Sequence, residues 1–148
     1  MKWTLVSNKS SDIREYHLVK DERTLVVMKY SPEQQTVRIS HEDDRQVFFM
    51  EDGGYANRIV LKNAYGVDLG KYSYNSRNQN GRLEINNDVY DYNIVEANQP
   101  KLIVHQRHKQ EPMAVCQIPD AILEPTSLYE HAGIVLSMCS INGLPASK

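Results

Sequence analysis

The sequence predicts a mainly β fold: a closed or nearly closed antiparallel β-barrel of about ten to twelve strands around a C-terminal hydrophobic α-helix. Short β-rich segments alternate with turn signals at spacings of about 8–12 residues, which is typical of an all-β sandwich or barrel. No segment before residue 119 shows a convincing helical period, which disfavours a sheet built from βαβ units. We therefore expect a single β-barrel domain spanning residues 1–148.

The expected strands are rich in β-branched and aromatic residues and are bounded by turn residues. Ser31-Pro32 and Gly53-Gly54 mark two of these turns. The Asn80-Gly81 pair is a strong hairpin signal because both residue types tolerate a positive φ. The expected strands are 3–6, 15–20, 24–30, 36–40, 46–50, 58–62, 68–74, 82–85, 89–95, 101–105 and 113–118.

The last apolar run, about residues 127–143, is expected to form the central helix of the fold. No Asp, Glu, Lys or Arg occurs from His131 to the residue before Lys148. A helix that is apolar on all sides must be enclosed, because no side of it suits water. The preceding strands are numerous enough to surround it, so we expect it to lie on the barrel axis.

The sequence also indicates where this helix begins and ends. Thr126 or Ser127 can cap its start, and Glu130, three residues after Ser127, completes a capping-box pattern. Gly143 and Pro145 stop the helix. A helix of about 16 residues is roughly 24 Å long, close to the height of a small barrel. The alternative is an amphipathic helix that caps an open barrel or packs on the face of a sandwich.

Composition narrows the class of protein. The net charge is −2 and the pI about 6.2, so no global positive field favours nucleic acid as a partner. Cys116 and Cys139 are too few for a disulfide scaffold and lack metal-site spacing. Neither apolar terminal segment has the length of a signal-peptide core or a membrane span. We expect a cytoplasmic protein without a transmembrane segment; the oligomeric state stays open.

Three elements of the sequence resemble the tubby C-terminal-like superfamily, which includes the LURP-one-related proteins and the phospholipid scramblases. They are the turn at residues 63–70, the hairpin of residues 81–92 and the apolar segment 129–141. The resemblance implies a closed barrel around a hydrophobic C-terminal helix. The resemblance does not extend to the particular basic residues on which phosphoinositide binding in tubby proteins depends, and the cysteine-rich segment of scramblases is absent. The resemblance therefore implies the fold more than an activity.

Basic residues gather in three adjacent expected strands and form the candidate binding site. Residues 58 and 62 share one face of their strand, opposite Ile59 and Leu61. If residues 71 and 82 face the same way, the result is a positive outer patch suited to phosphate or acidic headgroups. Asp68 and Glu84 dilute it, and the alternative is a solvated barrel exterior. The candidate ligand-binding residues are Arg58, Lys62, Lys71 and Arg82.

Other polar groups carry weaker signals. The turn at residues 41–44 holds three carboxylates and a histidine but lacks the spacing and glycine of a calcium loop. His105 and His108 lie at a strand end, where positions three apart point to opposite sides. The tyrosine pairs at 72 and 74 and at 90 and 92 share faces, as strand-stabilising pairs or as an aromatic wall for a ligand. We expect no catalytic residue, metal or cofactor.

Three functions remain for a sequence of this kind. The first is a non-enzymatic binding or scaffold protein that contacts anionic lipid or a protein partner through its outer surface. The second is a calycin-like carrier with a small hydrophobic ligand inside a hollow barrel, which requires the C-terminal segment to pack outside. The third is an enzyme whose site only the fold assembles, and no nucleophile elbow or phosphate loop in the sequence favours it.

Overall fold

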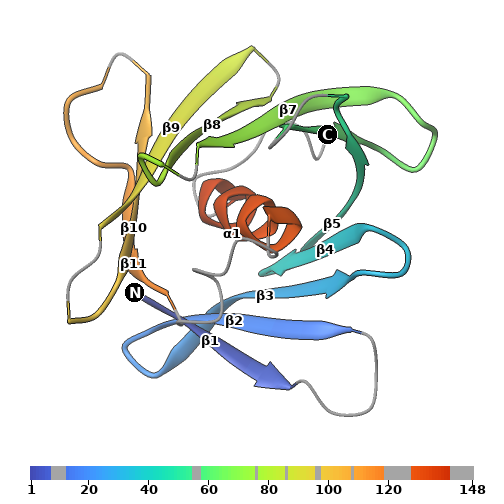
Figure 1. Ribbon diagram of the computed structural model, residues 1–148. Coiled ribbons are helices and arrows are strands. Elements are labelled where there is room, and N and C mark those ends of the chain that lie inside the picture. Colours follow the sequence, from blue (N-terminus) through green and yellow to red (C-terminus); the bar gives the residue numbers. More distant parts are fainter. Residues whose placement is uncertain are drawn as a thin grey trace.

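Eleven strands of the described chain form one closed sheet, and a helix occupies the space inside it (Figure 1). The computed structural model describes residues 1–7, 13–54, 58–75, 77–85, 87–95, 98–107, 109–118 and 128–140. The helix is α1, Leu128–Ser140. The strands are β1 Lys2–Ser7, β2 Arg14–Lys20, β3 Arg23–Ser31, β4 Thr36–His41, β5 Asp44–Asp52, β6 Arg58–Lys62, β7 Asp68–Asn75, β8 Asn80–Ile85, β9 Asp88–Val95, β10 Lys101–Gln106 and β11 Ala114–Gln117. The predicted barrel around a C-terminal helix is confirmed.

The strands follow one another around the barrel in chain order. Each strand pairs antiparallel with the next, whereas β1 and β11 close the barrel in parallel, with Lys2 opposite Gln117. An up-and-down path reverses direction at every step, so an odd number of strands must meet in parallel once. The closing pair is further held by the Gln117 amide, which donates to the Met1 carbonyl at 3.0 Å. The predicted antiparallel pairing is thus found between all consecutive strands of the barrel, and the closing pair β1–β11 is parallel.

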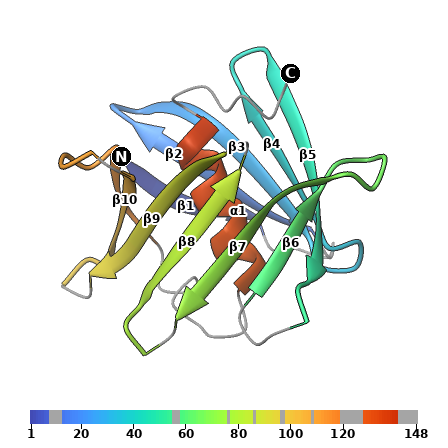
Figure 2. The ribbon, with the colours of Figure 1, turned by 90° about the horizontal axis from the view of Figure 1, so that it is seen from above.

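Helix α1 is enclosed by the strands, as its uniformly apolar sequence predicts. Every side chain from Glu130 to Cys139 is buried. A view at right angles to the first again places the helix inside the ring of strands (Figure 2). The predicted cap at Ser127 and the predicted stops at Gly143 and Pro145 lie outside the described residues. The helix therefore fills the barrel instead of capping an open end.

The helix lies close to the wall of the barrel at Gly133. A Cβ atom there would lie 2.7 Å from the Met28 sulfur on β3 and 3.0 Å from Cγ2 of Val37 on β4. Both distances are shorter than ordinary van der Waals contact, so the missing side chain lets the helix axis sit near these two strands. Small residues thus make room for the helix inside the barrel, as the sequence indicated.

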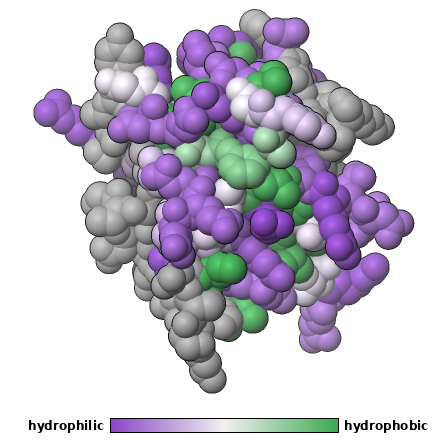
Figure 3. Space-filling view, turned by 90° about the vertical axis from the view of Figure 1, so that its right-hand side faces the viewer, coloured by the Kyte–Doolittle hydropathy of each residue, from purple (hydrophilic) through white to green (hydrophobic). Residues whose placement is uncertain are grey.

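The strands alternate between the core and the outer surface, as a half-buried sheet requires. On β9, for example, Tyr90, Tyr92 and Ile94 are buried, whereas the residues between them are half-buried or exposed. Figure 3 shows one side of the molecule, where hydrophilic side chains surround smaller hydrophobic areas. The polar side chains that solvent or a ligand can reach are therefore found at the outward positions of the strands.

Candidate functional site

The predicted basic residues of β6, β7 and β8 come together on the outer face of the barrel. Arg58 on β6 is opposite Ser73 on β7, which in turn is opposite Arg82 on β8. Two residues further along each strand, and so on the same face, Lys71 is opposite Glu84. Residues directly opposite each other in an antiparallel sheet point to the same side, so these five side chains share one surface. The conditional expectation that Lys71 and Arg82 face the same way as Arg58 is met.

These five residues line a surface hollow of about 150 Å³, which we call the β6–β8 hollow. Its lining consists of three cations, one hydroxyl and one carboxylate: Arg58, Lys71, Arg82, Ser73 and Glu84. A site of this size suits a small polar group that carries negative charge, such as a phosphate.

Two of the cations in the hollow, Arg82 and Lys71, differ in their ion pairs with nearby carboxylates. Arg82 Nε lies 3.1 Å from Asp91 Oδ1, and Arg107 Nε lies 3.9 Å from the other oxygen of the same carboxylate. Lys71 forms no ion pair within the described part of the chain. Ion pairs this exposed are weak and exchange readily with a ligand. The hollow therefore keeps positive charge at Lys71 and in the guanidinium groups.

Lys62, the fourth predicted binding residue, lies apart from the β6–β8 hollow. Its ammonium is 2.9 Å from Glu51 Oε2 on β5 and 3.8 Å from Asp68 Oδ1 on β7. The hydrogen bond to Glu51 raises the pKa of Lys62 above its usual value, and the charge of Asp68 adds to the shift. The Lys62 ammonium is thus already paired with two carboxylates. The structure brings together three of the four predicted cations, and Lys62 is not among them.

A second polar cluster lies inside the barrel, around the first turn of α1. Arg14 Nη1 donates to Glu130 Oε1 at 2.6 Å, and the Tyr16 hydroxyl donates to the other carboxylate oxygen. Glu130 is only 4% exposed and Tyr16 is fully buried. Burial and the hydrogen bond to Glu130 raise the pKa of Tyr16 well above its ordinary value. These hydrogen bonds connect the helix to β2. The sequence pattern predicted a role for Glu130 only in capping the helix.

Aromatic side chains meet the helix on the opposite wall. The Tyr92 hydroxyl donates to that of Tyr72, and the two rings stack with centroids 5.5 Å apart. Tyr74 stacks on Tyr92 at 6.1 Å and meets the His131 ring edge-on at 5.0 Å. Of the predicted tyrosine pairs, Tyr72, Tyr90 and Tyr92 are thus buried in the core, and Tyr74 contacts the helix through His131.

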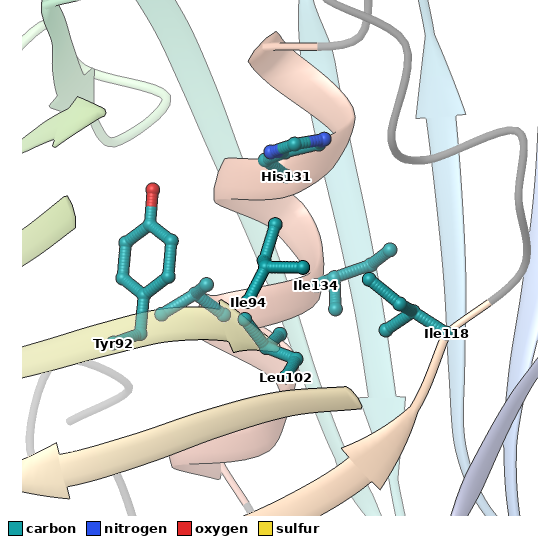
Figure 4. Close-up of a pocket in the computed structure, with 7 residues that line it drawn as sticks. Tyr92, Ile94, Leu102, Ile118, His131 and Ile134 are labelled. Carbon is teal, nitrogen blue, oxygen red and sulfur yellow. The ribbon is translucent and has the colours of Figure 1, made fainter. Parts of the chain in front are cut away.

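The space between α1 and strands β9 and β10 is too narrow for a ligand. Figure 4 shows Tyr92, Ile94, Leu102 and Ile118 approaching the helix near His131 and Ile134. No part of the space among these side chains accommodates a water. Among the described residues, this region is packed core.

Burial of His131 predicts that acid destabilises the fold. Burial disfavours the imidazolium and lowers the pKa of His131 from 6.5 to about 4. Between pH 6.5 and about 4, His131 is protonated in the unfolded chain but stays neutral in the folded chain. The free energy of unfolding should therefore fall by about 1.4 kcal/mol per pH unit from pH 6.5 to about 4, or by about 3 kcal/mol in total. Urea denaturation from pH 7.5 to 4.5 measures this slope.

The matched variant for this measurement is His131→Gln, which has a similar size and does not titrate. Carboxylates elsewhere also titrate near the acidic end, so the informative quantity is the difference in slope between wild type and variant. An equal slope in both proteins would show that His131 is not the group responsible.

The weaker candidates from the sequence do not assemble into a site. His41 Nδ1 lies 2.9 Å from the Leu25 carbonyl oxygen, and the residues after it form an exposed hairpin turn. Burial raises the pKa of the Cys116 thiol to about 12, which keeps it protonated and unreactive. His108 lies outside the described residues. Within the described ranges, no group of three or more His, Cys, Asp or Glu could hold a metal ion.

The described helix is too short to cross a membrane, and no other described segment forms a helix that could. Comparisons with protein-family models, curated proteins and solved structures find no match to this chain. The structure itself therefore defines the class: a closed β-barrel filled by its C-terminal helix, with a cationic hollow on its outer face.

Proposed function

We propose that this chain is a non-enzymatic binding or scaffold protein of tubby-like fold, whose β6–β8 hollow binds an anionic group, foremost an anionic lipid headgroup. The observation that carries the proposal is the convergence of Arg58, Lys71 and Arg82 on one hollow. Guanidinium groups bind phosphate through paired hydrogen bonds, and basic residues near a surface attract anionic lipid. The barrel around a C-terminal helix, which the resemblance to tubby proteins implies, supports the fold assignment.

The filled interior favours this function over the carrier. A calycin-like carrier needs a hollow barrel, whereas α1 occupies the axis here and Ile134, Val135 and Leu136 are fully buried. Among the described residues, the space between the helix and strands β9 and β10 accommodates no ligand. Recognition then falls to the outer face and the loops, where the β6–β8 hollow lies.

The double variant Arg58→Glu with Lys71→Glu tests the binding site. Each basic residue near an anionic membrane contributes about 1 kcal/mol, so loss of two should weaken binding by at least about thirtyfold. Binding is measured by sedimentation with vesicles of phosphatidylcholine and phosphatidylglycerol. Vesicles of phosphatidylcholine should bind neither protein, and salt should weaken the wild-type interaction because exposed charges are screened.

The matched control is Arg38→Glu with Arg45→Glu, on exposed positions of β4 and β5. It changes the net charge equally but leaves the hollow intact, so it should retain most of the binding. Lys62→Glu tests the remaining predicted cation, and we expect a smaller loss because Glu51 and Asp68 already hold Lys62. Equal binding by wild type and the Arg58→Glu, Lys71→Glu variant would exclude the hollow as the site.

A further inference from the structure

The β6–β8 hollow contains a carboxylate that a site for a simple anion would not need. Glu84 lines the hollow together with Arg58, Lys71, Arg82 and Ser73. A negative charge at this position repels an incoming anion and lowers its affinity. Its presence is explained if the ligand also carries a positive group that the carboxylate can bind.

The arrangement of Lys71 and Glu84 points the same way. The two residues are directly opposite across β7 and β8, where opposite charges commonly pair. Nevertheless, no ion pair of 4.0 Å or less joins them in the structure. Glu84 is half-buried and Lys71 is exposed. Both charged groups are thus available to a ligand in the hollow.

We propose that the ligand of the β6–β8 hollow is a phosphate joined by a short chain to a protonated amine, as in phosphoethanolamine and its lipids. This inference rests on the proposed function: the ligand keeps the anionic phosphate proposed there and adds a positively charged amine. The phosphate binds to Arg58, Arg82 and the Ser73 hydroxyl, which lie in one row across the sheet, with Lys71 beside them. The ammonium binds to the Glu84 carboxylate in the next row.

Distances in the sheet agree with a ligand of this length. Glu84 follows Arg82 by two residues on β8. At about 3.4 Å per residue, their Cα atoms are about 7 Å apart on the same face. A phosphate and an ammonium separated by two carbons can bridge the two rows, because the side chains that bind them also span part of this distance. The hollow of about 150 Å³ is large enough for such a molecule.

Calorimetric titration with phosphoethanolamine and with ethyl phosphate tests this proposal. Ethyl phosphate has the same phosphate and carbon chain but no amine. An ion pair at this solvent-exposed site should make wild type bind phosphoethanolamine up to about fivefold more tightly. The variant Glu84→Gln should remove that preference and bind ethyl phosphate at least as well as wild type, because it loses the repulsive charge.

The matched control is Glu51→Gln, another outward glutamate on a strand, which pairs with Lys62 outside the hollow. It should keep the wild-type preference. Equal affinity of wild type for the two compounds would overturn the inference and leave the proposed function standing. If wild type binds neither compound, and the double variant Arg58→Glu with Lys71→Glu does not change vesicle binding, both this inference and the proposed function are overturned.

A vesicle arm distinguishes a lipid headgroup from a free metabolite. Phosphatidylethanolamine offers an N–H donor to Glu84, whereas the trimethylated amine of phosphatidylcholine does not. The wild-type protein should sediment more with vesicles of phosphatidylethanolamine and phosphatidylcholine than with vesicles of phosphatidylcholine alone. If Glu84→Gln removes this difference, the ligand is a membrane lipid. Binding of free phosphoethanolamine without vesicle binding assigns it to a soluble compound.

Discussion

Deletion of residues 127–148 is expected to abolish cooperative folding of the barrel. The deleted segment includes Ile134, Val135, Leu136 and Met138, all fully buried. Burial of such side chains contributes about 1.5–3 kcal/mol each, or about 6–12 kcal/mol for the four. That equals the whole free energy of unfolding of a typical domain, about 5–15 kcal/mol. Far-UV circular dichroism and urea denaturation of the truncated chain should show no cooperative transition.

A point variant in the full chain tests the same idea without changing its length. Ile134→Asp places a charge in the packed interior and should also prevent folding, because an unpaired buried charge is costly. The control Val95→Asp makes the same kind of change at a side chain that is 40% exposed, and it should leave the transition nearly unchanged. A truncated chain that keeps a sharp transition would mean that the barrel stands without the helix, as a carrier requires.

Replacement of Glu130 by alanine should destabilise the fold by about 3 kcal/mol or more. The change removes the carboxylate that accepts hydrogen bonds from Arg14 and Tyr16. The hydroxyl of Tyr16 and part of the Arg14 guanidinium would then remain buried without this partner. Loss of one partner from a buried ion pair costs about 3–5 kcal/mol for this reason. Urea denaturation at pH 7 measures the change.

Two further variants show whether this loss comes from the pair. In Arg14→Met the same carboxylate loses its cation, and the double variant Arg14→Met with Glu130→Ala should lose less than the sum of the two single variants. The control Glu15→Ala removes a half-exposed carboxylate on the same strand and should cost about 1 kcal/mol or less. Additive losses would show that Arg14 and Glu130 do not act together.

Much of the fold could be predicted because its causes are local. Alternation of apolar and polar residues defined the strands, since side chains on a strand point to opposite faces in turn. The uncharged run after Glu130 indicated an enclosed helix because no side of it suits water. The same alternation placed Arg58 and Lys62 on the outer face of one strand. Each of these inferences needs only neighbouring residues.

The candidate site was harder to predict because it depends on register between strands. Arg58, Ser73 and Arg82 form one row only because β6, β7 and β8 pair with a particular offset. A bulge between Leu61 and Lys62 shifts the pairing at the end of β6, and Lys62 meets Glu51 and Asp68 there. A shift of one residue would turn every side chain to the other face, and composition does not reveal such shifts.

The sequence by itself thus determined the barrel, its approximate strands and the enclosed helix, since hydrophobic periodicity and turn residues act over a few positions. Only the tertiary structure decided that the closing pair β1–β11 is parallel, that Glu130 binds Arg14 and Tyr16, and that Glu84 joins three cations in one hollow. Residues 14 and 130 are 116 positions apart. Their contact arises from where the folded barrel places the helix, which no local pattern specifies.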